Sequence, residues 1–290
     1  MLIVDAHVHV WAAHSPERPW PKWAIGTPEW PRQITQRAEP VTKDEVLAKM
    51  NDNGVARAVI IPPHFEGDRN DLALEAARLH PDRFAVMGRL EGPMDENTPA
   101  MRRMVATWRE RPGMLGMRLT FKAKPHRALL ADRRADWLWA EAEKAGVPIA
   151  VLIDPEQIEH VDRIAERHPA LKLVMDHLCL VSHERDAQVF ACLDRILALA
   201  QRPNVAMKAS ALPCYSSAPY PYRNLHPYLR RIYDAFGPRR IFWGTDFVRL
   251  PCSYGQAITM ITEEIPWLTT EDNEWIMGRG LCEWIGWKLP

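Results

Sequence analysis

Short apolar segments recur along this chain, and longer stretches with apolar residues every three or four positions lie between them. Eight apolar segments predict β-strands: residues 2–10, 56–62, 83–90, 114–121, 147–153, 171–178, 204–210 and 239–246. Six stretches of helical spacing end at glycine or proline and predict α-helices: residues 43–54, 71–81, 135–148, 158–169, 190–203 and 224–238. Strands and helices are therefore expected to alternate.

This alternation decides the expected fold class. Parallel strands need long crossover connections, usually helices, and strands that are apolar throughout are covered on both faces. A chain of 290 residues with eight such strands fits one (β/α)8 TIM barrel, an α/β fold, as a single domain spanning residues 1–290. A doubly wound sheet is the alternative, but no GxGxxG motif follows the first strand.

One segment, residues 11–40, breaks the alternation. It contains several prolines and four tryptophans, and proline at this density argues against regular structure. A loop of this length inside a compact domain is usually functional or disordered. We expect an insertion after strand 1 that caps the barrel mouth, or alternatively a decoration held down by its tryptophans. The same segment is also the candidate contact of a homodimer.

Charge and cysteine content narrow the function classes. Lys+Arg and Asp+Glu both number 37, so no net charge favours nucleic acid or an anionic membrane. The five cysteines show no CxxC pair, a pattern typical of a reducing compartment. No apolar run reaches the ~18 residues that a membrane span needs, and the N-terminus does not resemble a signal peptide. A cytoplasmic protein is the expectation.

Polar residues mark the ends of the predicted strands, where the functional groups of a TIM barrel gather. They are His7 and His9 (strand 1), His64 (strand 2), Arg89 (strand 3), Arg118 (strand 4), His177 (strand 6), Lys208 (strand 7) and Asp246 (strand 8). Alternate residues of a strand share a face, so both strand 1 histidines can point into the lumen. Because strand 8 closes the barrel beside strand 1, Asp246 is expected near the histidine pair.

Two imidazoles at alternate strand positions commonly hold a divalent cation, since both neutral rings reach one point. The competing interpretation is that His7 and His9 are ordinary buried polar groups with hydrogen-bond partners. The arrival of Asp246 and His177 at the same end of the barrel favours a reaction site.

The motifs DAHVHVW, LGMRLTF, LVMDHLC and FWGTDF together resemble the amidohydrolase superfamily. The resemblance is to its amidohydrolase-related (amidohydrolase 2) branch, which contains pyrone-dicarboxylate and sugar lactonases and also metal-dependent decarboxylases. It covers nearly the whole chain, down to WIMGRGLCEWIGW, which resembles the helix that closes these domains.

The resemblance implies roles for four residues. His7 and His9 resemble a strand 1 pair that binds metal or, in metal-free lactonases, polarises a carbonyl group. His177 resembles the strand 6 histidine beside the reacting group. Asp246 resembles the strand 8 aspartate that takes a proton from the attacking water.

Cations of the predicted lumen imply an anionic substrate. Arg118 and Lys208 resemble barrel-lining residues that bind substrate carboxylates. Arg89 would add a third cation, and buried cations without partners are costly. Each of the three can instead be the salt-bridge partner of a core acid. His64 and Tyr215, on the loops after strands 2 and 7, are further candidates for substrate binding or plain surface residues.

The sequence departs from the pattern of metal-dependent relatives at one position, and this bears on whether a metal ion is bound. Metal-dependent relatives usually add a histidine or a carboxylated lysine from strand 4 or 5, and strand 5 ends here without either. Asp154 follows it but is typical of a helix N-cap. One divalent ion, zinc or manganese, could be held by His7, His9, Asp246 and His177, but the missing ligand favours a metal-free site.

The expected function is a hydrolase that opens a small cyclic ester (lactone) or related carbonyl compound, carrying a carboxylate, with water activated by Asp246. One alternative is a metal-dependent decarboxylase of an aromatic or unsaturated acid. Another is a barrel that binds a small anion without catalysis. No phosphate-binding loop or nucleophile elbow is present.

Overall fold

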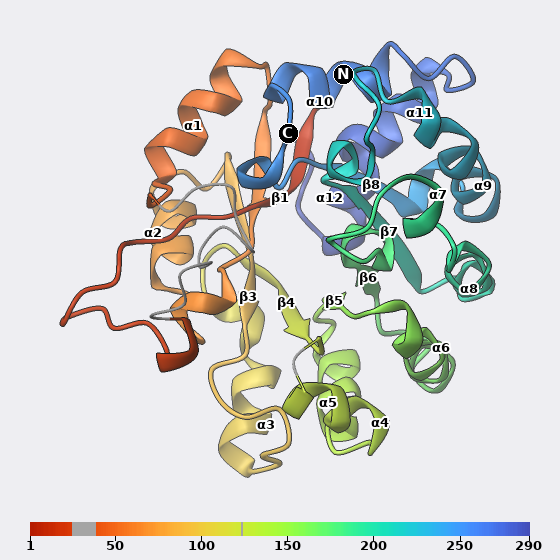
Figure 1. The fold of residues 1–290 in the computed structure, drawn as a ribbon. Coiled ribbons are helices and arrows are strands. Elements are labelled where there is room, and N and C mark those ends of the chain that lie inside the picture. Colours follow the sequence, from red (N-terminus) through yellow and green to blue (C-terminus); the bar gives the residue numbers. More distant parts are fainter. Residues whose placement is uncertain (25–38, 123) are drawn as a thin grey trace.

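The computed structural model describes residues 1–24, 39–122 and 124–290. Its centre is one sheet in which eight parallel strands follow each other in chain order (Figure 1). The strands are β1 (Val4–Val8), β2 (Arg57–Ile60), β3 (Phe84–Arg89), β4 (Met114–Thr120), β5 (Ile149–Leu152), β6 (Leu173–Met175), β7 (Val205–Ser210) and β8 (Ile241–Gly244). The predicted strands and the TIM barrel are confirmed.

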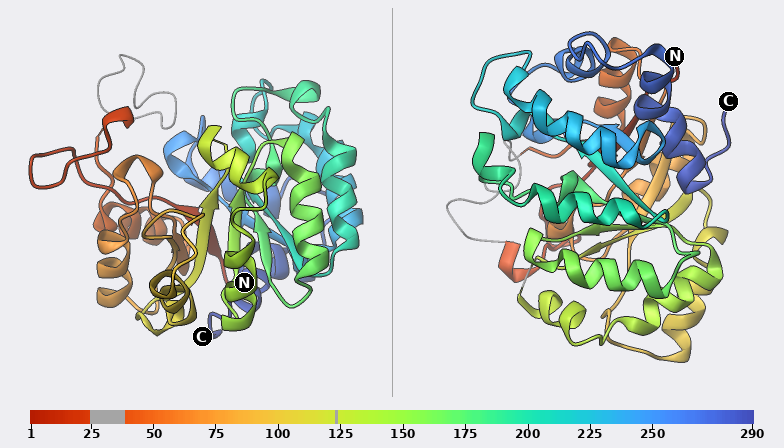
Figure 2. Two further views of the ribbon diagram at one scale, coloured as in Figure 1. Left: turned by 90° about the horizontal axis from the view of Figure 1, so that it is seen from below. Right: turned by 90° about the vertical axis from the view of Figure 1, so that its right-hand side faces the viewer.

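Helices surround the sheet, as the views of Figure 2 show. They are α1 (Lys43–Asp52), α2 (Asp71–Leu79), α3 (Pro99–Ala106), α4 (Lys124–Ala131), α5 (Asp136–Ala145), α6 (Ile158–Arg167), α7 (Asp186–Val189), α8 (Leu193–Ala198), α9 (His226–Phe236), α10 (Tyr254–Thr262), α11 (Thr270–Glu274) and α12 (Gly280–Ile285). The six predicted helices are all present. The crossover helix α3 was not predicted, because its eight residues are too few for a periodic pattern to stand out.

Two apolar clusters lie on the two faces of the barrel wall. The larger fills the space between strands and helices. The smaller occupies the lumen and includes Val4, Ala6, Val59, Ile61, Met87, Ala150, Val174, Ala206 and Phe242, together with Leu281, Cys282 and Ile285 of α12. Helix α12 therefore packs against the lumen core, consistent with the closing role predicted for this segment.

The segment after β1 is held against the β2 side of the barrel. The rings of Trp11 and Trp20 lie 5.5 and 5.2 Å from that of Phe65, and the Trp11 N–H donates to the Val41 carbonyl (2.9 Å). Arg18 forms an ion pair with Glu66 (2.8 Å). The predicted cap lies largely at residues 25–38, outside the described residues, so its capping role stays a prediction.

The structure also bears on the expectations about cysteines and membrane spans. All five cysteines are free thiols. No helix among the described residues is both long and apolar enough to cross a membrane.

Candidate active site

A local irregularity of β1 turns its histidines into the lumen. Val4 and Ala6 belong to the lumen cluster, so strict alternation would send His7 to the outer face. The pairing of β1 with β2 shifts register between Asp5 and Val8. This shift reverses the phase of the strand, since Val8 then packs with the outer cluster while His7 contacts Asp176 and His177, the two residues that follow β6, across the lumen.

The buried carboxylate of Asp5 joins the two ends of the sheet. Its Oδ1 accepts the backbone N–H groups of His7 and Thr245, both at 2.9 Å. Its Oδ2 accepts the hydroxyl groups of Thr245 and Tyr254. Within the described residues no hydrogen-bond ladder links β8 to β1. Asp5 and one backbone bond, from the Asp246 N–H to the His7 carbonyl (2.8 Å), close the barrel at the histidines.

We expect Asp5→Ala to lower the free energy of unfolding by about 2–5 kcal/mol, because two buried backbone N–H groups lose their acceptor. Asp5→Asn should cost about 1 kcal/mol or less, since its amide oxygen keeps both N–H bonds and its amide nitrogen can donate to the two hydroxyls. Urea unfolding of the three proteins measures this difference. Equal losses in both variants would contradict the proposed closure.

Left-handed backbone conformations place the next two site residues. His177 follows β6 at φ 52°, inside the helical turn η5 (Asp176–Cys179), and Asp246 follows β8 at φ 45°. Such angles are uncommon for residues other than glycine and cluster at functional sites. They bring consecutive side chains toward the lumen, which simple strand alternation does not do. The Ser210 hydroxyl at the end of β7 is 2.8 Å from His177 Nδ1 and fixes that ring.

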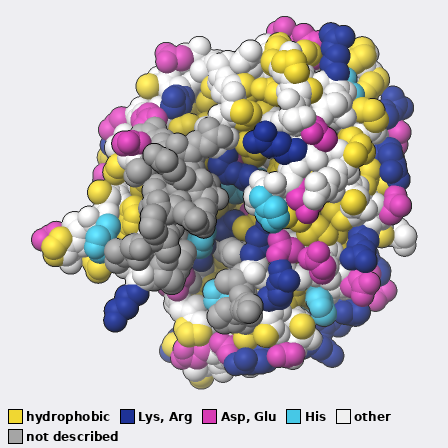
Figure 3. Space-filling view, in the orientation of Figure 1, with side chains coloured by type: hydrophobic (Ala, Val, Ile, Leu, Met, Phe, Trp, Pro, Cys, Tyr) yellow, Lys and Arg dark blue, Asp and Glu magenta, His cyan; other side chains and the backbone are white. Residues whose placement is uncertain are grey.

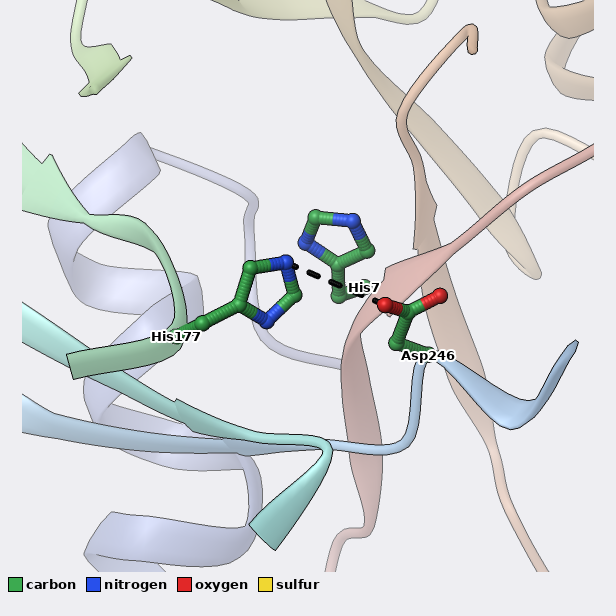
Figure 4. A group of neighbouring side chains, drawn as sticks. All are labelled: His7, His177 and Asp246. Atoms are coloured by element: carbon green, nitrogen blue, oxygen red, sulfur yellow. Dashed lines mark ion pairs between the residues drawn. The ribbon is translucent and has the colours of Figure 1, made fainter. Parts of the chain in front are cut away.

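His7, His177 and Asp246 face one another in the lumen (Figure 4). The His7 and His177 ring centroids are 4.6 Å apart, and His177 Nε2 lies 3.8 Å from Asp246 Oδ2. His9 completes the group, with its Nε2 3.3 Å from His7 Nε2 and 3.5 Å from Asp246 Oδ1. The four residues that the sequence placed at strand ends therefore meet at one point.

The tautomer of His9 follows from its backbone contact. Its Nδ1 lies 2.6 Å from the Ile61 carbonyl oxygen and must donate there. The Nε2 lone pair then faces His7 Nε2 and Asp246 Oδ1, and this carboxylate oxygen has no hydrogen-bond partner among the described residues. These two acceptor atoms can be satisfied by an N–H group of His7, by a water molecule or by a bound cation.

The three imidazoles are neutral at pH 7. Burial lowers the pKa of His177 to about 3, and it lowers the pKa of His7 well below the usual range, with the His177 and Lys208 charges adding to it. Burial also lowers the pKa of His9, although Asp246 opposes the shift. Neutral rings keep a lone pair free for a ligand or an N–H free to donate, but they store no proton for acid catalysis.

Asp176 lies beneath the histidines and was missed by the sequence analysis. Its Oδ1 is 3.0 Å from Lys208 Nζ and 3.8 Å from His7 Nδ1, and its Oδ2 is 3.2 Å from Arg118 Nε. Burial opposes its ionisation, but the Lys208 and Arg118 charges outweigh burial and lower its pKa. Arg118 and Lys208, predicted to bind substrate, are thus both paired with a core acid.

The remaining predicted residues lie to either side of this centre. His64 is close to Arg118 and Arg89, whose charges add to burial in lowering its pKa to about 3. Tyr215 is fully buried and lies against Arg249, which is 3.4 Å from Asp246 Oδ2. Lys, Arg and His side chains gather around a hollow on this face in Figure 3.

The donor set fits a divalent cation. His7, His177 and Asp246 offer ligand atoms that lie within 4.8 Å of one another, and His9 Nε2 adds a fourth donor. Imidazole nitrogen with one carboxylate suits zinc and manganese. Asp154, which follows β5, forms a capping box with Gln157, so its predicted N-cap role is confirmed.

A family model described as amidohydrolase matches residues 4–279. The chain belongs to the amidohydrolase family. It is 25% identical over 256 residues to an L-fucono-1,5-lactonase from Burkholderia ambifaria, a match that covers 84% of this chain and 79% of the relative. The protein is therefore an enzyme of the hydrolase class.

Solved structures share the fold. An amidohydrolase from Burkholderia multivorans with bound zinc has a TM-score of 0.79 at 21% identity and full coverage of both chains. A probable 2-pyrone-4,6-dicarboxylic acid hydrolase from Acinetobacter baumannii, with citric acid bound, has a TM-score of 0.76 at 15% identity, covering 99% of this chain and 100% of the other. A 5-carboxyvanillate decarboxylase from Sphingomonas paucimobilis reaches 0.69 at 15% identity, covering 98% and 99%. These identities support the architecture alone.

Proposed function

We propose that the protein hydrolyses small lactones, with the site built by His7, His9, His177 and Asp246. The observation that supports this most strongly is the Asp246 carboxylate, which is 2% exposed and lies between two neutral imidazoles. Its Oδ1 has no hydrogen-bond partner among the described residues and lies 3.5 Å from His9 Nε2, and its Oδ2 lies 3.8 Å from His177 Nε2. An unpaired carboxylate oxygen in such a setting is suited to accept a proton from water. The lactonase relatives point to the same chemistry.

The reaction proceeds in two steps. Asp246 takes a proton from a water molecule as the water oxygen bonds to the ester carbonyl carbon. The tetrahedral intermediate then collapses, the bond between the carbonyl carbon and the ring oxygen breaks, and the ring oxygen takes the proton that Asp246 removed from the water. The product carries a hydroxyl group and a carboxylic acid, which loses its proton to solvent and leaves Asp246 ionised. Arg249, 3.4 Å from Asp246 Oδ2, holds the carboxylate in place.

Neutral imidazoles stabilise the charge that develops on the carbonyl oxygen. His177, whose Nδ1 is held by the Ser210 hydroxyl group, can present its Nε2 N–H group to that oxygen. When a divalent cation such as zinc or manganese is bound by these donors, it supplies Lewis acidity at the carbonyl group. Because β5 adds no ligand, we expect the reaction to need no metal.

Substrate binding is divided between two groups of residues. Arg118 lines the pocket and contacts the substrate, whereas Lys208 is fully buried and acts from below through Asp176, the acid that both cations share. Arg89 lines the same pocket and His64 lies close to both arginines, whereas Tyr215 is fully buried against Arg249 and does not reach the substrate. A carboxylate-bearing lactone fits this cationic surface. A cytoplasmic location and a homodimer through residues 11–40 stay predictions.

An activity panel tests the proposal. Purified protein is incubated with γ- and δ-lactones and with aromatic acids, before and after chelation and with added zinc or manganese. Ring opening of lactones, retained after chelation, is expected. Release of CO2 from the aromatic acids with a strict metal requirement would identify a decarboxylase, a reaction for which the structural neighbour and the donor set give precedent. Ligand binding without turnover would identify a non-catalytic barrel.

A further inference from the structure

A cavity of about 250 Å³ opens at the end of the barrel opposite the histidine site. Its lining comes from the loops that lead into β5 and β6 and from the end of α12, and includes Gly146, Pro148, Leu171 and Trp284. The histidine site lies instead where the strands end. The two are separate sites, and the proposed lactone hydrolysis does not involve this cavity.

Two helices end at this cavity and are joined by an arginine. Gly146 after α5 (φ 62°) and Gly286 after α12 (φ 69°) both adopt the left-handed conformation that is common at helix C-termini. Arg109 donates from Nη1 to the Gly146 carbonyl (3.1 Å) and from Nη2 to the Ile285 carbonyl (3.2 Å). It therefore ties the two helix ends together.

Lys172 adds a second cation to the lining of the cavity. Its Nζ lies 3.4 Å from the Glu283 carbonyl oxygen and 5.6 Å from the centroid of the Trp284 ring. Both Lys172 and Arg109 are exposed. A guanidinium group has five N–H donors and an ammonium group has three, so each side chain keeps donors that a ligand can reach.

No acid is among the described residues that line the cavity. Two glutamates lie nearby in the chain and are engaged elsewhere. Glu143 faces His168 Nδ1 (2.9 Å) and accepts the Ala170 N–H (2.9 Å), and Glu283 pairs with Arg279 (3.1 Å). Each helix end contributes about half a negative charge, so the two cations leave the cavity with roughly one net positive charge.

The rest of the cavity is mainly apolar. Val147, Pro148, Leu171 and the Trp284 ring contribute its walls. The Trp284 Nε1 atom is buried without a hydrogen-bond partner among the described residues, so it offers a ligand no contact but reports on the cavity. An apolar hollow that carries cations matches an organic anion better than an inorganic one, because only the organic anion also buries apolar surface.

We propose that this cavity is a second ligand site, which binds a small monocarboxylate with an apolar or aromatic body. The carboxylate meets Arg109 and Lys172, and the body packs on the apolar walls. Because Arg109 is held by two carbonyl groups, its guanidinium group is preorganised for the ligand.

A matched pair of probes tests this site. Phenylacetate carries one carboxylate, and phenylacetamide has nearly the same shape without the charge. The Trp284 indole N–H resonance of ¹⁵N-labelled protein, identified by its absence from Trp284→Phe, reports binding at this cavity and not in the lumen. We expect phenylacetate to shift the resonance with a Kd of about 1 mM or tighter, and phenylacetamide to bind about three- to tenfold more weakly.

Two variants separate charge from shape. Lys172→Met removes one cation, so it should weaken phenylacetate binding at least about twofold and leave phenylacetamide binding unchanged. Ala170→Phe, at an exposed position of the lining, should fill the cavity and abolish the shift by both probes. Arg103→Met, at an exposed arginine of α3, controls for the loss of a positive charge elsewhere and should change the binding of neither probe.

Kinetics keep this site apart from the proposed function. Lys172→Met and Ala170→Phe should retain wild-type kcat and KM for lactone opening, because both residues lie at the opposite end of the barrel from the histidines. Three results would overturn the second site: no shift of the Trp284 resonance up to about 10 mM phenylacetate, equal binding of acid and amide, or inorganic phosphate binding as tightly as phenylacetate. Unchanged phenylacetate binding in Ala170→Phe would overturn it as well.

Discussion

Asp246→Asn should lower kcat for lactone opening by about 10²–10⁴-fold, the range that a positioned general base contributes. The amide has no oxygen basic enough to take the proton of the attacking water. Asparagine tolerates the left-handed backbone of this position (φ 45°) and keeps the backbone bond to His7, so the fold and KM should change little. Steady-state kinetics and circular dichroism measure both.

The control for this variant is Asp234→Asn. Asp234 is an exposed acid on α9 that pairs with Arg230 of the same helix, and its loss should leave kcat unchanged. Retention of wild-type activity by Asp246→Asn would exclude this carboxylate as the base.

The second large effect is expected at Asp176. Asp176→Asn leaves Lys208 (0% exposed) and Arg118 (5% exposed) without their acid, and breaking a buried ion pair from one side costs about 3–5 kcal/mol. The free energy of unfolding, measured with urea, should fall by that amount. His7 also loses the acid behind its ring, so activity should fall as well.

A double mutant tests the cause of this loss. Asp176→Asn combined with Lys208→Met removes one of the two stranded cations and should recover part of the stability lost in the single variant. The exposed pair of Asp194 and Arg231 is the reference, because Asp194→Asn should cost about 1 kcal/mol or less. Strict additivity of the two buried substitutions would mean that Asp176 and Lys208 do not interact.

Much of the fold was predictable because its signals are local. Each apolar segment ends at a polar residue or a turn, and eight such segments in regular alternation leave few topologies. That β8 brings Asp246 close to the end of β1 followed from barrel closure. The turn of His7 into the lumen did not, because it depends on the register shift of β1, which periodicity does not predict.

The electrostatic floor of the site was not predictable in the same way. Asp176 stands directly before His177, and alternation assigns only one of two neighbours to the lumen, so the histidine was chosen. The left-handed backbone of His177 brings both in. The sequence signal for Asp176 was its position: it is an acid at the end of a buried strand, directly before a predicted site histidine.

The same omission affected the predicted substrate cations. Arg89, Arg118 and Lys208 were taken together because each closes a strand, but two of them share an acid that no spacing rule connects to them. Ion pairs between side chains of different strands depend on which residues lie at the same level along the barrel axis, and the sequence does not give that level. Asp5 was equally hidden, since its role arises from an unpaired edge between β8 and β1.

The most direct test of lactone hydrolysis follows the oxygen atom of water. A lactone opened in H2¹⁸O by the wild-type protein should give a hydroxy acid with one ¹⁸O atom in its new carboxylate, none in its hydroxyl group, and no CO2. The label should be absent when Asp246→Asn replaces the wild-type protein over the same period. Release of CO2 with an unlabelled product, or label in the hydroxyl group, would contradict attack of an Asp246-activated water on the carbonyl carbon.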